Sequence, residues 1–531
     1  MTAFGNRGQK PTTGEAGGLS VVGSLRTRWS ATLARSLGLV RRHRIFAIVL
    51  SVAVLPRVLA MLSYQPAILF RLDSFDYLWG ALHPSPNVIN PSGYSLFLWL
   101  LLPFHSLVLV VVLQHLMGLG IGVMIYAVLR RYGLPGWGAT LAALPVLFDP
   151  GQILLEQSIM ADLLAMALMM AAFTIVLLAE RASIWWLVTA GLLMGISVTV
   201  WPATLPLIIL LAAFLLIRRA GWRRAGAVLA AGAVPVVAYM GWFDAAHGSF
   251  NLTNSNGMFL WSRTMSFADC SVIRPAPALR PLCPEQQPGS LGAADPARRP
   301  PPKSYLWGNQ HGTWEWQHVR PQFVPDTGAF TAANNARALQ FALRAITAQP
   351  FAYAGVVLKQ TVVPFAGLHR LNFPVGPQPK GFGLYLSEAN FRYAYAAAHG
   401  YARSTGAVTR IARYNYATVV HAPYAHLMNV YQRVIFLPGP LLGILALVGL
   451  GGALIPGRRS AAGWLLWLSA VIIIVLPTAE HEYDPRYDIL AVPLICLAAA
   501  LAFRKPEPKQ DARQSPERAA RSAPAVSPGQ G

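Results

Sequence analysis

The chain has 531 residues, of which 54% are hydrophobic and only 12% are charged, and its formal net charge is +22. A soluble chain carries roughly 25% charged residues, so this composition excludes an ordinary soluble enzyme of several domains. The hydrophobic content also excludes a disordered protein. Because the apolar residues come in runs of about 15 to 25, long enough to cross a bilayer, the sequence predicts an all-α polytopic membrane protein.

The basic residues lie in short groups between the apolar runs and form no single patch, which argues against a nucleic-acid partner. The junctions at the opposite ends of the runs are almost free of lysine and arginine. Under the positive-inside rule, the basic groups are cytoplasmic and orient the whole chain. We therefore expect an integral protein of a bacterial plasma membrane. The basic groups are Arg41, Arg42 and Arg44; Arg130 and Arg131; Arg218, Arg219, Arg223 and Arg224; Arg458 and Arg459; and Arg504 with Lys505.

The N-terminal part of the chain divides into a tail and a transmembrane module. Residues 1–44 are basic and rich in Gly, Ser and Thr, which predicts a disordered cytoplasmic tail. Residues 45–243 form the N-terminal transmembrane catalytic module, with an outside loop at 64–92 and a short membrane-dipping helix at 94–103. Its spans are predicted near 45–63, 106–129, 136–148, 163–179, 184–200, 203–217 and 225–243. The glycine triplet Gly118, Gly120 and Gly122 inside one span indicates helix packing.

Residues 244–432 form a long region outside the cytoplasm, irregular at first and then containing an amphipathic segment at 332–367. Within this segment, 350–368 is apolar enough to be an extra span, but Lys359 and Gln360 lie in its middle. A central lysine costs about 2.5–3.5 kcal/mol on insertion scales, so this span stays open. The C-terminal transmembrane helices fill 433–503, and 504–531 is a disordered cytoplasmic tail. The total is about ten spans, the last three near 434–455, 462–477 and 489–503.

The chain has three cysteines. Cys270 and Cys283 both lie in the outside region, where disulfides are permitted, and they are 13 positions apart. We expect them to be bridged. Cys496 lies in the last span, where a free cysteine usually serves as inert packing.

The first outside loop contains Asp73, Asp76 and Tyr77, followed by Pro91 and Tyr94. This loop resembles the polyprenyl-phosphate-dependent glycosyltransferases of the GT-C class, which include protein O-mannosyltransferases and lipid A aminoarabinose transferases. In that family, a D-E-x-x-Y-like element is followed by a P-x-x-Y element that leads into the next helix. The spacing of Asp73 and Tyr77 matches the first element, and Pro91 and Tyr94 match the second. The resemblance covers about 45–245 and the last outside corner.

Ser74 departs from this pattern, because the family usually has a second acid at that position. Asp76, two positions later, fits three roles: that second acid, a ligand of a divalent cation, or a solvated residue. The resemblance implies transfer of a sugar from a polyprenyl-phosphate carrier to an outside acceptor, with inversion. The acceptor would be a glycan, a lipid or a protein. In this reaction Asp73 would be the general base, and the alternative is that it only caps a short helix.

Other candidate residues come from the remaining outside corners. Glu156 and Asp162 match the family's acids by position only, and Asp162 also suits a helix N-terminus. Arg486 and Tyr487 resemble an R-Y element that related enzymes place near the lipid phosphate, whereas the alternative for Arg486 is an arginine that reaches the membrane surface. Arg263 is a candidate for a sugar or acceptor pocket, against ordinary packing.

The site hypothesis requires Asp73 and Arg486 to lie close enough to contact one phosphosugar. Two other functions compete with it: a transporter or flippase of lipid-linked sugars, and an inactive scaffold for envelope assembly. Transporters tend to have internal repeats and broken helices at the membrane midplane, and the sequence displays neither. The scaffold remains open because Ser74 replaces an acid.

Overall fold

The computed structural model describes residues 43–70, 73–179, 183–287, 289–307, 330–367, 373, 418–455 and 461–504. The predicted tails 1–44 and 504–531 therefore lie almost wholly outside the described residues. So do Arg41, Arg42, Arg458, Arg459 and Lys505, which belong to the predicted basic groups.

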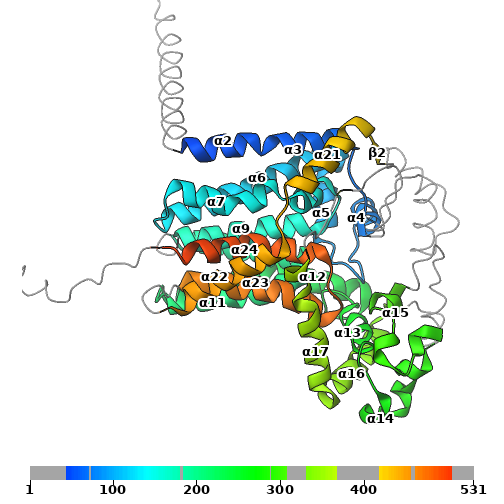
Figure 1. Ribbon diagram of the computed structural model, residues 1–531. Helices are drawn as coiled ribbons and strands as arrows, with labels where there is room; N and C mark the ends of the chain where they lie inside the picture. The colour runs from blue at the N-terminus through cyan, green and yellow to red at the C-terminus, as the bar shows by residue number, and fades with distance from the viewer. Residues whose placement is uncertain are drawn as a thin grey trace, which may run out of the picture.

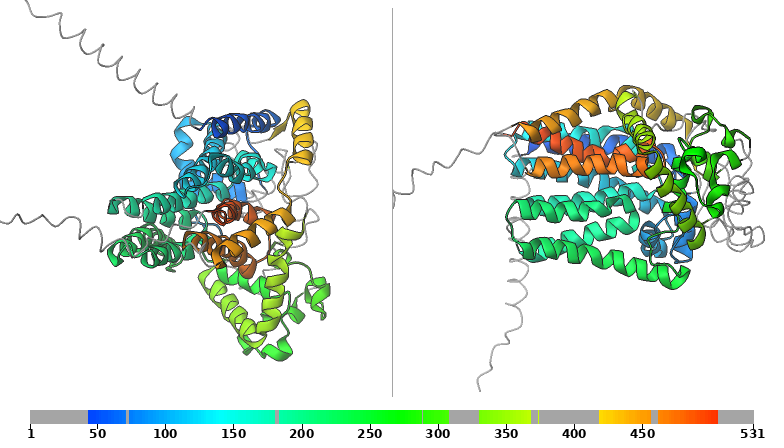
Figure 2. Two further views of the ribbon diagram at one scale, coloured as in Figure 1. Left: turned by 60° about the vertical axis from the view of Figure 1, so that its left-hand side comes forward. Right: turned by 90° about the horizontal axis from the view of Figure 1, so that it is seen from below.

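Long apolar helices form a bundle in which neighbours run side by side (Figures 1 and 2). In the described part of the chain, a helix or helix pair occupies each of the ten predicted spans, which confirms an all-α polytopic membrane protein. The bundle helices are α2 (Arg44–Val52) with α3 (Val54–Ser63), α6 (Leu107–Arg131), α7 (Gly136–Phe148), α9 (Ala161–Ala179), α10 (Ile184–Val200), α11 (Leu205–Ile217), α12 (Trp222–His247), α22 (Gly439–Leu454), α23 (Ala461–Glu480) and α24 (Pro485–Leu501).

The bundle helices differ in how easily each could cross a bilayer alone. Among the described residues, five helices or continuous helix pairs are long and apolar enough: Arg44–Ser63, Leu107–Arg131, Ala161–Leu178, Trp222–His247 and Ala461–Glu480. The number rises to eight if each of three bent helix pairs is one span. The shorter helices, such as α24 with 17 residues, depend on their neighbours more than on their own hydropathy.

The bundle has two chemically different ends because its helices alternate in direction. The described members of the predicted basic groups lie where α2 begins, α6 ends, α11 meets α12 and α24 ends, and we call this the basic end; it lies at the left of Figure 1. The opposite end, which we call the loop end, carries most of the structure between the spans (Figure 1). The charge pattern that oriented the sequence therefore corresponds to a real separation in space.

Short elements at the loop end hold the first loop in place. Strand β1 (Tyr64–Gln65) pairs antiparallel with β2 (Val419–Val420), with Tyr64 opposite Val420. Helix α4 (Asp73–Leu82) lies within this loop, and α5 (Gly93–Leu101) corresponds to the predicted membrane-dipping helix. Helix α8 (Pro150–Gln157) leads into α9, and α21 (Ala422–Val434) leads into α22.

A second, smaller core lies outside the bundle at the loop end. It is built from α13 (Asn256–Thr264), α14 (Cys270–Ile273), α15 (Lys303–Trp307) and α16 (Ala332–Ala348), together with 3-10 turns at Pro277–Leu282, Pro284–Gln286, Gly289–Gly292 and Pro296–Arg298. The predicted disulfide is confirmed: the sulfurs of Cys270 and Cys283 are 2.02 Å apart. The free Cys496 is buried, as expected.

The candidate extra span at 350–368 does not continue the direction of the preceding helix. Helix α17 (Pro350–Thr361) bends from α16 by 100°, and the short α18 (Val363–Ala366) follows it. None of the residues of α17 is buried, and its Phe351 is 91% exposed. Figure 1 shows α17 crossing the direction of the bundle helices.

Candidate active site

Three helices begin next to one another at the loop end, and each carries a charged residue in its first turn. Asp73 opens α4, Asp162 lies in the first turn of α9, and Arg486 lies in the first turn of α24. Asp484 caps α24, since its Oδ1 accepts a hydrogen bond from the backbone N–H of Arg486 at 3.1 Å. Carboxylates at helix N-termini are stabilised by the helix dipole, so the local sequence favours this clustering of acids.

The guanidinium of Arg486 lies among three carboxylates. Its Nη1 is 2.7 Å from Oδ2 of Asp73 and 4.0 Å from Oδ2 of Asp162, and its Nε is 3.7 Å from Oδ1 of Asp484. The side chain of Asp162 is 4% exposed, whereas those of Asp73 and Arg486 are 25% and 19% exposed. Asp73 and Arg486, which are 413 positions apart, therefore meet at a partly open site, as the site hypothesis requires.

Aromatic side chains lie beside this ion cluster. The Arg486 guanidinium lies 5.5 Å from the ring centre of Tyr487, and that ring lies 5.8 Å from the ring of Trp201. On α4, Tyr77 is buried and its ring meets that of Tyr94 edge to face at 5.0 Å. The predicted candidates Asp73, Tyr77, Arg486 and Tyr487 therefore lie in this cluster or on the helix turns that form it.

Asp76 lies one residue before Tyr77 on α4, with its side chain half-buried. Burial, and to a smaller extent the charge of Asp73, raises the pKa of Asp76 to about 7, and a side-chain hydrogen bond with Asn90 opposes the shift. Asp76 is therefore partly protonated near neutral pH, and Asp73 is the acid of α4 that contacts Arg486.

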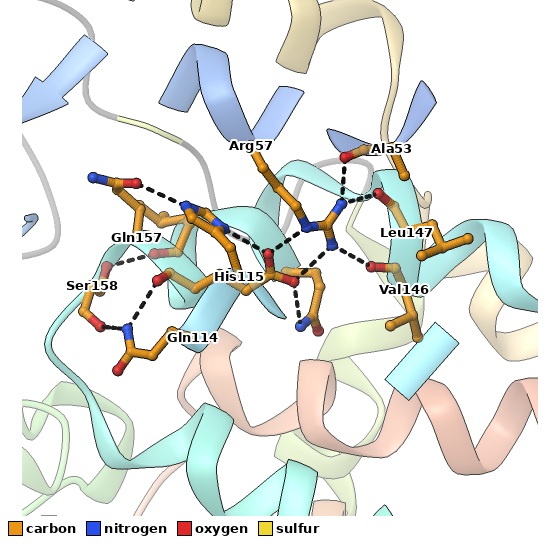
Figure 3. Close-up of polar contacts among 11 residues, drawn as sticks. Ala53, Arg57, Gln114, His115, Val146, Leu147, Gln157 and Ser158 are labelled. Atoms are coloured by element: carbon orange, nitrogen blue, oxygen red, sulfur yellow. Dashed lines mark hydrogen bonds and ion pairs between the residues drawn. The ribbon is translucent and has the colours of Figure 1, made fainter. Parts of the chain in front are cut away.

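Glu156 does not line this cluster, although we expected it to. Its side chain has no exposed surface and lies inside the bundle, where Nε of Arg57 and Nδ1 of His115 each lie 2.8 Å from its Oε2. Gln152 donates to its other oxygen at 3.1 Å. Figure 3 shows this network, which joins α3, α6 and α8. The carboxylate of Glu156 already has these protein partners. Its position between two predicted spans matched the family's acids, but the structure places its side chain inside the bundle, away from Arg486.

Arg263 lies on α13, in the smaller core, and is fully buried. Its Nη1 donates to Oε1 of Gln360 at 2.9 Å, and the same oxygen accepts from the backbone N–H of Tyr483 at 3.0 Å. Its Nε and Nη2 have no hydrogen-bond partner within the described structure. Burial lowers the pKa of Arg263 to about 10, which still leaves it charged at neutral pH. Through Tyr483, Arg263 connects to the segment that begins α24.

Sequence reasoning missed His115 and the glutamines around it. Gln114, His115 and Gln157 are all buried, and two of them lie inside an otherwise apolar span, where polar side chains are costly. Arg57 likewise lies within the first apolar run, and its side chain is buried and contacts Glu156 and the carbonyl of Leu147. A polar or charged residue inside an apolar run was therefore the feature of the sequence that could have revealed this buried network.

A divalent cation was also considered, with Asp76 as a ligand. Among the described residues, only Cys270, Cys283 and Glu285 bring three His, Cys, Asp or Glu ligand atoms within 4.8 Å of one another. The two cysteines form the disulfide and so cannot bind a metal as thiolates. In the candidate site, Asp73, Asp162 and Asp484 each lie beside the guanidinium of Arg486.

These features define a helical integral membrane protein with a charged, partly open site at one end of its bundle. No family model matches the sequence, and no curated protein matches it. Two solved structures are similar to the chain, each with a TM-score of 0.31. One is ArnT from Cupriavidus metallidurans in the apo state, with 15% identity over 86% of this chain and 76% of that chain.

The other similar structure is the Archaeoglobus fulgidus oligosaccharyltransferase tethered to an acceptor peptide containing the NVT sequon. Its identity to this chain is 13%, over 88% of this chain and 56% of that one. A TM-score of 0.31 is too low to align individual residues, so the roles of the site residues depend on the geometry described above.

Proposed function

We propose that the protein is a membrane glycosyltransferase that moves a sugar from a polyprenyl-phosphate carrier to an acceptor at the loop end. The observation that carries the proposal is the 2.7 Å contact between Asp73 and Arg486. It joins a carboxylate from the first loop, suited to accept a proton, to a cation from the last helix, suited to bind a phosphate.

The reaction needs few groups because a phosphate is already a good leaving group. The acceptor hydroxyl oxygen attacks the anomeric carbon from the side opposite the phosphate, so the configuration inverts. The bond between that carbon and the phosphate oxygen breaks, and the electron pair leaves with the phosphate. Asp73 takes the hydroxyl proton, and Arg486 balances the charge on the departing phosphate.

Binding of the donor would rearrange the ion cluster in a useful way. Arg486 contacts Asp73, and the singly charged phosphodiester of the donor offers the guanidinium a competing anionic partner, whose charge increases when the phosphate departs. When the guanidinium turns to the phosphate, the Asp73 carboxylate loses its cation and becomes a better proton acceptor. Asp162 and Asp484 would keep Arg486 in place during this exchange.

The remaining candidates take supporting roles in the proposal. Tyr487, which is partly exposed, offers aromatic surface beside Arg486, which suits a sugar ring, and Tyr77 packs behind it as a buried residue against Tyr94. The two unpartnered nitrogens of Arg263, Nε and Nη2, suit an anionic group of a substrate. Asp76 is partly protonated near neutral pH, which reduces the negative charge next to Asp73. The acceptor, whether glycan, lipid or protein, would approach from the loop end, outside the cytoplasm, because the basic end is cytoplasmic under the positive-inside rule.

Sugar transfer from a series of polyprenyl-phosphate monosaccharides, assayed in detergent, tests this function. We expect Asp73→Asn to lose about 10²-fold or more in transfer rate, the usual contribution of general-base catalysis. Asparagine caps a helix about as well as aspartate, so folding should be unaffected. Arg486→Gln should instead weaken binding of the unsugared polyprenyl phosphate.

Asp244→Asn is the matched control, since Asp244 is an exposed acid near the end of α12, and it should keep the parental rate. Parental activity of Asp73→Asn would remove Asp73 from the mechanism. Movement of labelled carrier across a liposome membrane without any covalent transfer would instead support the transporter.

A further inference from the structure

Ser74 occupies the position where the resembled family usually has a second acid, and the structure shows what this serine does. Its side chain is fully buried. Its Oγ accepts a hydrogen bond from the backbone N–H of Phe70 at 2.8 Å and donates one to the carbonyl of Ile159 at 2.7 Å. An ionised carboxylate has no proton to donate to that carbonyl. The hydroxyl therefore makes a link between two chain segments that an acid could not make.

The segment that Ser74 contacts is itself held tightly to the first loop. The backbone N–H of Ile68 donates to the carbonyl of Gln157 at 2.9 Å, and that of Ile159 donates to Ile68 at 3.0 Å. Gln114 donates from Nε2 to the carbonyl of Ser158 at 2.7 Å. The turn between α8 and α9 is thus joined to the strand-like start of the first loop on one side and to α6 on the other.

A second cluster, which we call the buried ion cluster, consists of Arg57, His115 and Glu156 and holds this turn from inside the bundle (Figure 3). Arg57 on α3 binds both oxygens of Glu156, with its Nη2 donating to Oε1 at 2.8 Å, and it also donates to the carbonyl of Leu147 at 2.8 Å. His115 contacts Glu156 through one ring nitrogen and Oε1 of Gln157 through the other, at 3.0 Å. These residues are all at most 4% exposed, so the cluster is a buried support that several polar contacts link to three helices.

The two ends of this chain of contacts are the acids of the candidate site. Ser74 directly follows Asp73. Ile159 lies in the turn between α8 and α9, three residues before Asp162 in the first turn of α9. The hydrogen bond between Ser74 and Ile159 therefore sets how far Asp73 lies from Asp162 and from the Arg486 that contacts Asp73.

We propose that Ser74 is a positioning residue, which ties Asp73 to the buried ion cluster of Arg57, His115 and Glu156. This role rests on the proposed function, in which Asp73 is the general base. A displacement of about 1 Å at a reacting group can cost about 10²-fold in rate. The hydroxyl of Ser74 thus acts on the reaction without touching the substrate.

The test compares four variants by steady-state kinetics per folded molecule. We expect Ser74→Ala to lower kcat about 10-fold or more and to leave the KM for the donor unchanged, because the phosphate-binding arginine stays in place. Ser74→Thr keeps the hydroxyl and should recover most of kcat. Ser74→Asp restores the acid of the family pattern but lacks the donated proton, so it should not recover activity. Ser469→Ala is the matched control.

Ser469 suits this control because it is equally buried and its hydroxyl binds only the carbonyl of Leu465 within its own helix. Parental kcat in Ser74→Ala, or equal loss of folded protein in Ser74→Ala and Ser469→Ala with no change in kcat, would overturn the proposal.

Hydrogen exchange of the α4 amides gives a second measurement that needs no activity. Ser74→Ala should speed exchange in 73–82, and Ser469→Ala should not. If the parent transfers no sugar, the proposed function fails while this measurement still decides the position of α4. Unchanged exchange in Ser74→Ala would count against Ser74 as a positioning residue.

Discussion

The two aspartates of α4 illustrate how the environment of a single residue divides chemically identical groups. Asp73 lies against the guanidinium of Arg486 at 2.7 Å. The pKa of Asp76 is raised to about 7 by burial and, less strongly, by the charge of its neighbour. One acid of the pair therefore contacts a cation, whereas the other is partly protonated near neutral pH.

This difference predicts how stability depends on pH. The pKa of Asp76 is higher in the folded protein than its ordinary value of 3.8, so the folded state binds the proton more tightly than the unfolded state. The stability contributed by this proton is complete below about pH 4 and is lost as the pH rises through about 7. Asp76→Asn removes this contribution. We expect the Tm of Asp76→Asn minus that of the parent to be larger at pH 8 than at pH 5.

The measurement is thermal unfolding of both proteins in one detergent at the two pH values. A difference in Tm that does not change between pH 5 and pH 8 would show that Asp76 titrates as it does in the unfolded chain.

Residue-level predictions from the sequence succeeded where the chain itself sets the position. Asp73 and Arg486 lie at helix starts on the same side of the membrane, so the direction of each span was enough to bring them to one end. The placement of Glu156 and the role of Ser74 depend on contacts with Arg57 and Ile159, which are far away in the sequence. A single sequence holds no signal for such pairs.

At the scale of elements, α6 shows why glycines on one helix are not equivalent. The predicted role in helix packing holds for Gly118, since a Cβ there would lie 1.8 Å from Oε1 of Glu156. It also holds for Gly122, where a Cβ would lie 2.5 Å from Leu147. A Cβ at Gly120 would meet nothing within 4 Å. The glycine at 118 allows α6 to approach the buried ion cluster.

A pair of substitutions on α6 tests this difference. Gly118→Ala should destabilise the protein by about 1–3 kcal/mol from overpacking alone, and more if it separates Glu156 from Arg57. Gly120→Ala adds a methyl group in open space and should stabilise the helix by about 0.5–1 kcal/mol. The midpoints of unfolding in detergent measure both. Equal effects of the two alanines would show that α6 and α8 do not approach as closely as described.

At the scale of the whole molecule, the spans and the loop region could be predicted because runs of apolar residues and clusters of arginine report directly on the bilayer. The ends of the spans were less accurate: the span predicted at 434–455 begins at Gly439 in α22. Helix α17 was ambiguous in the sequence because its length and hydropathy fit a span, whereas its 100° bend from α16 is a tertiary feature.

The separation of the basic and loop ends makes a prediction about topology. A tag inserted after Arg131 should be labelled only from the cytoplasm, and a tag after Gly292 only from the opposite side. Gly292 is a suitable site because it ends a 3-10 turn in the small outer core. Selective labelling of intact cells and of inverted vesicles measures both. Cytoplasmic labelling at Gly292 would reverse the orientation and remove the proposed function with it.

Helix α24 comes last among the described helices, yet it lies in the middle of the bundle. It packs against α6, α7, α8, α9, α22 and α23, and all but one of the residues from Asp488 to Leu501 are buried. The helices made earlier must therefore leave a central slot in the bundle until α24 itself has been synthesised. A chain arrested before Pro485 would lack both its central helix and the arginine of the candidate site. Termination just before α24 should thus give an inactive, loosely packed fragment that membrane proteases can recognise and remove.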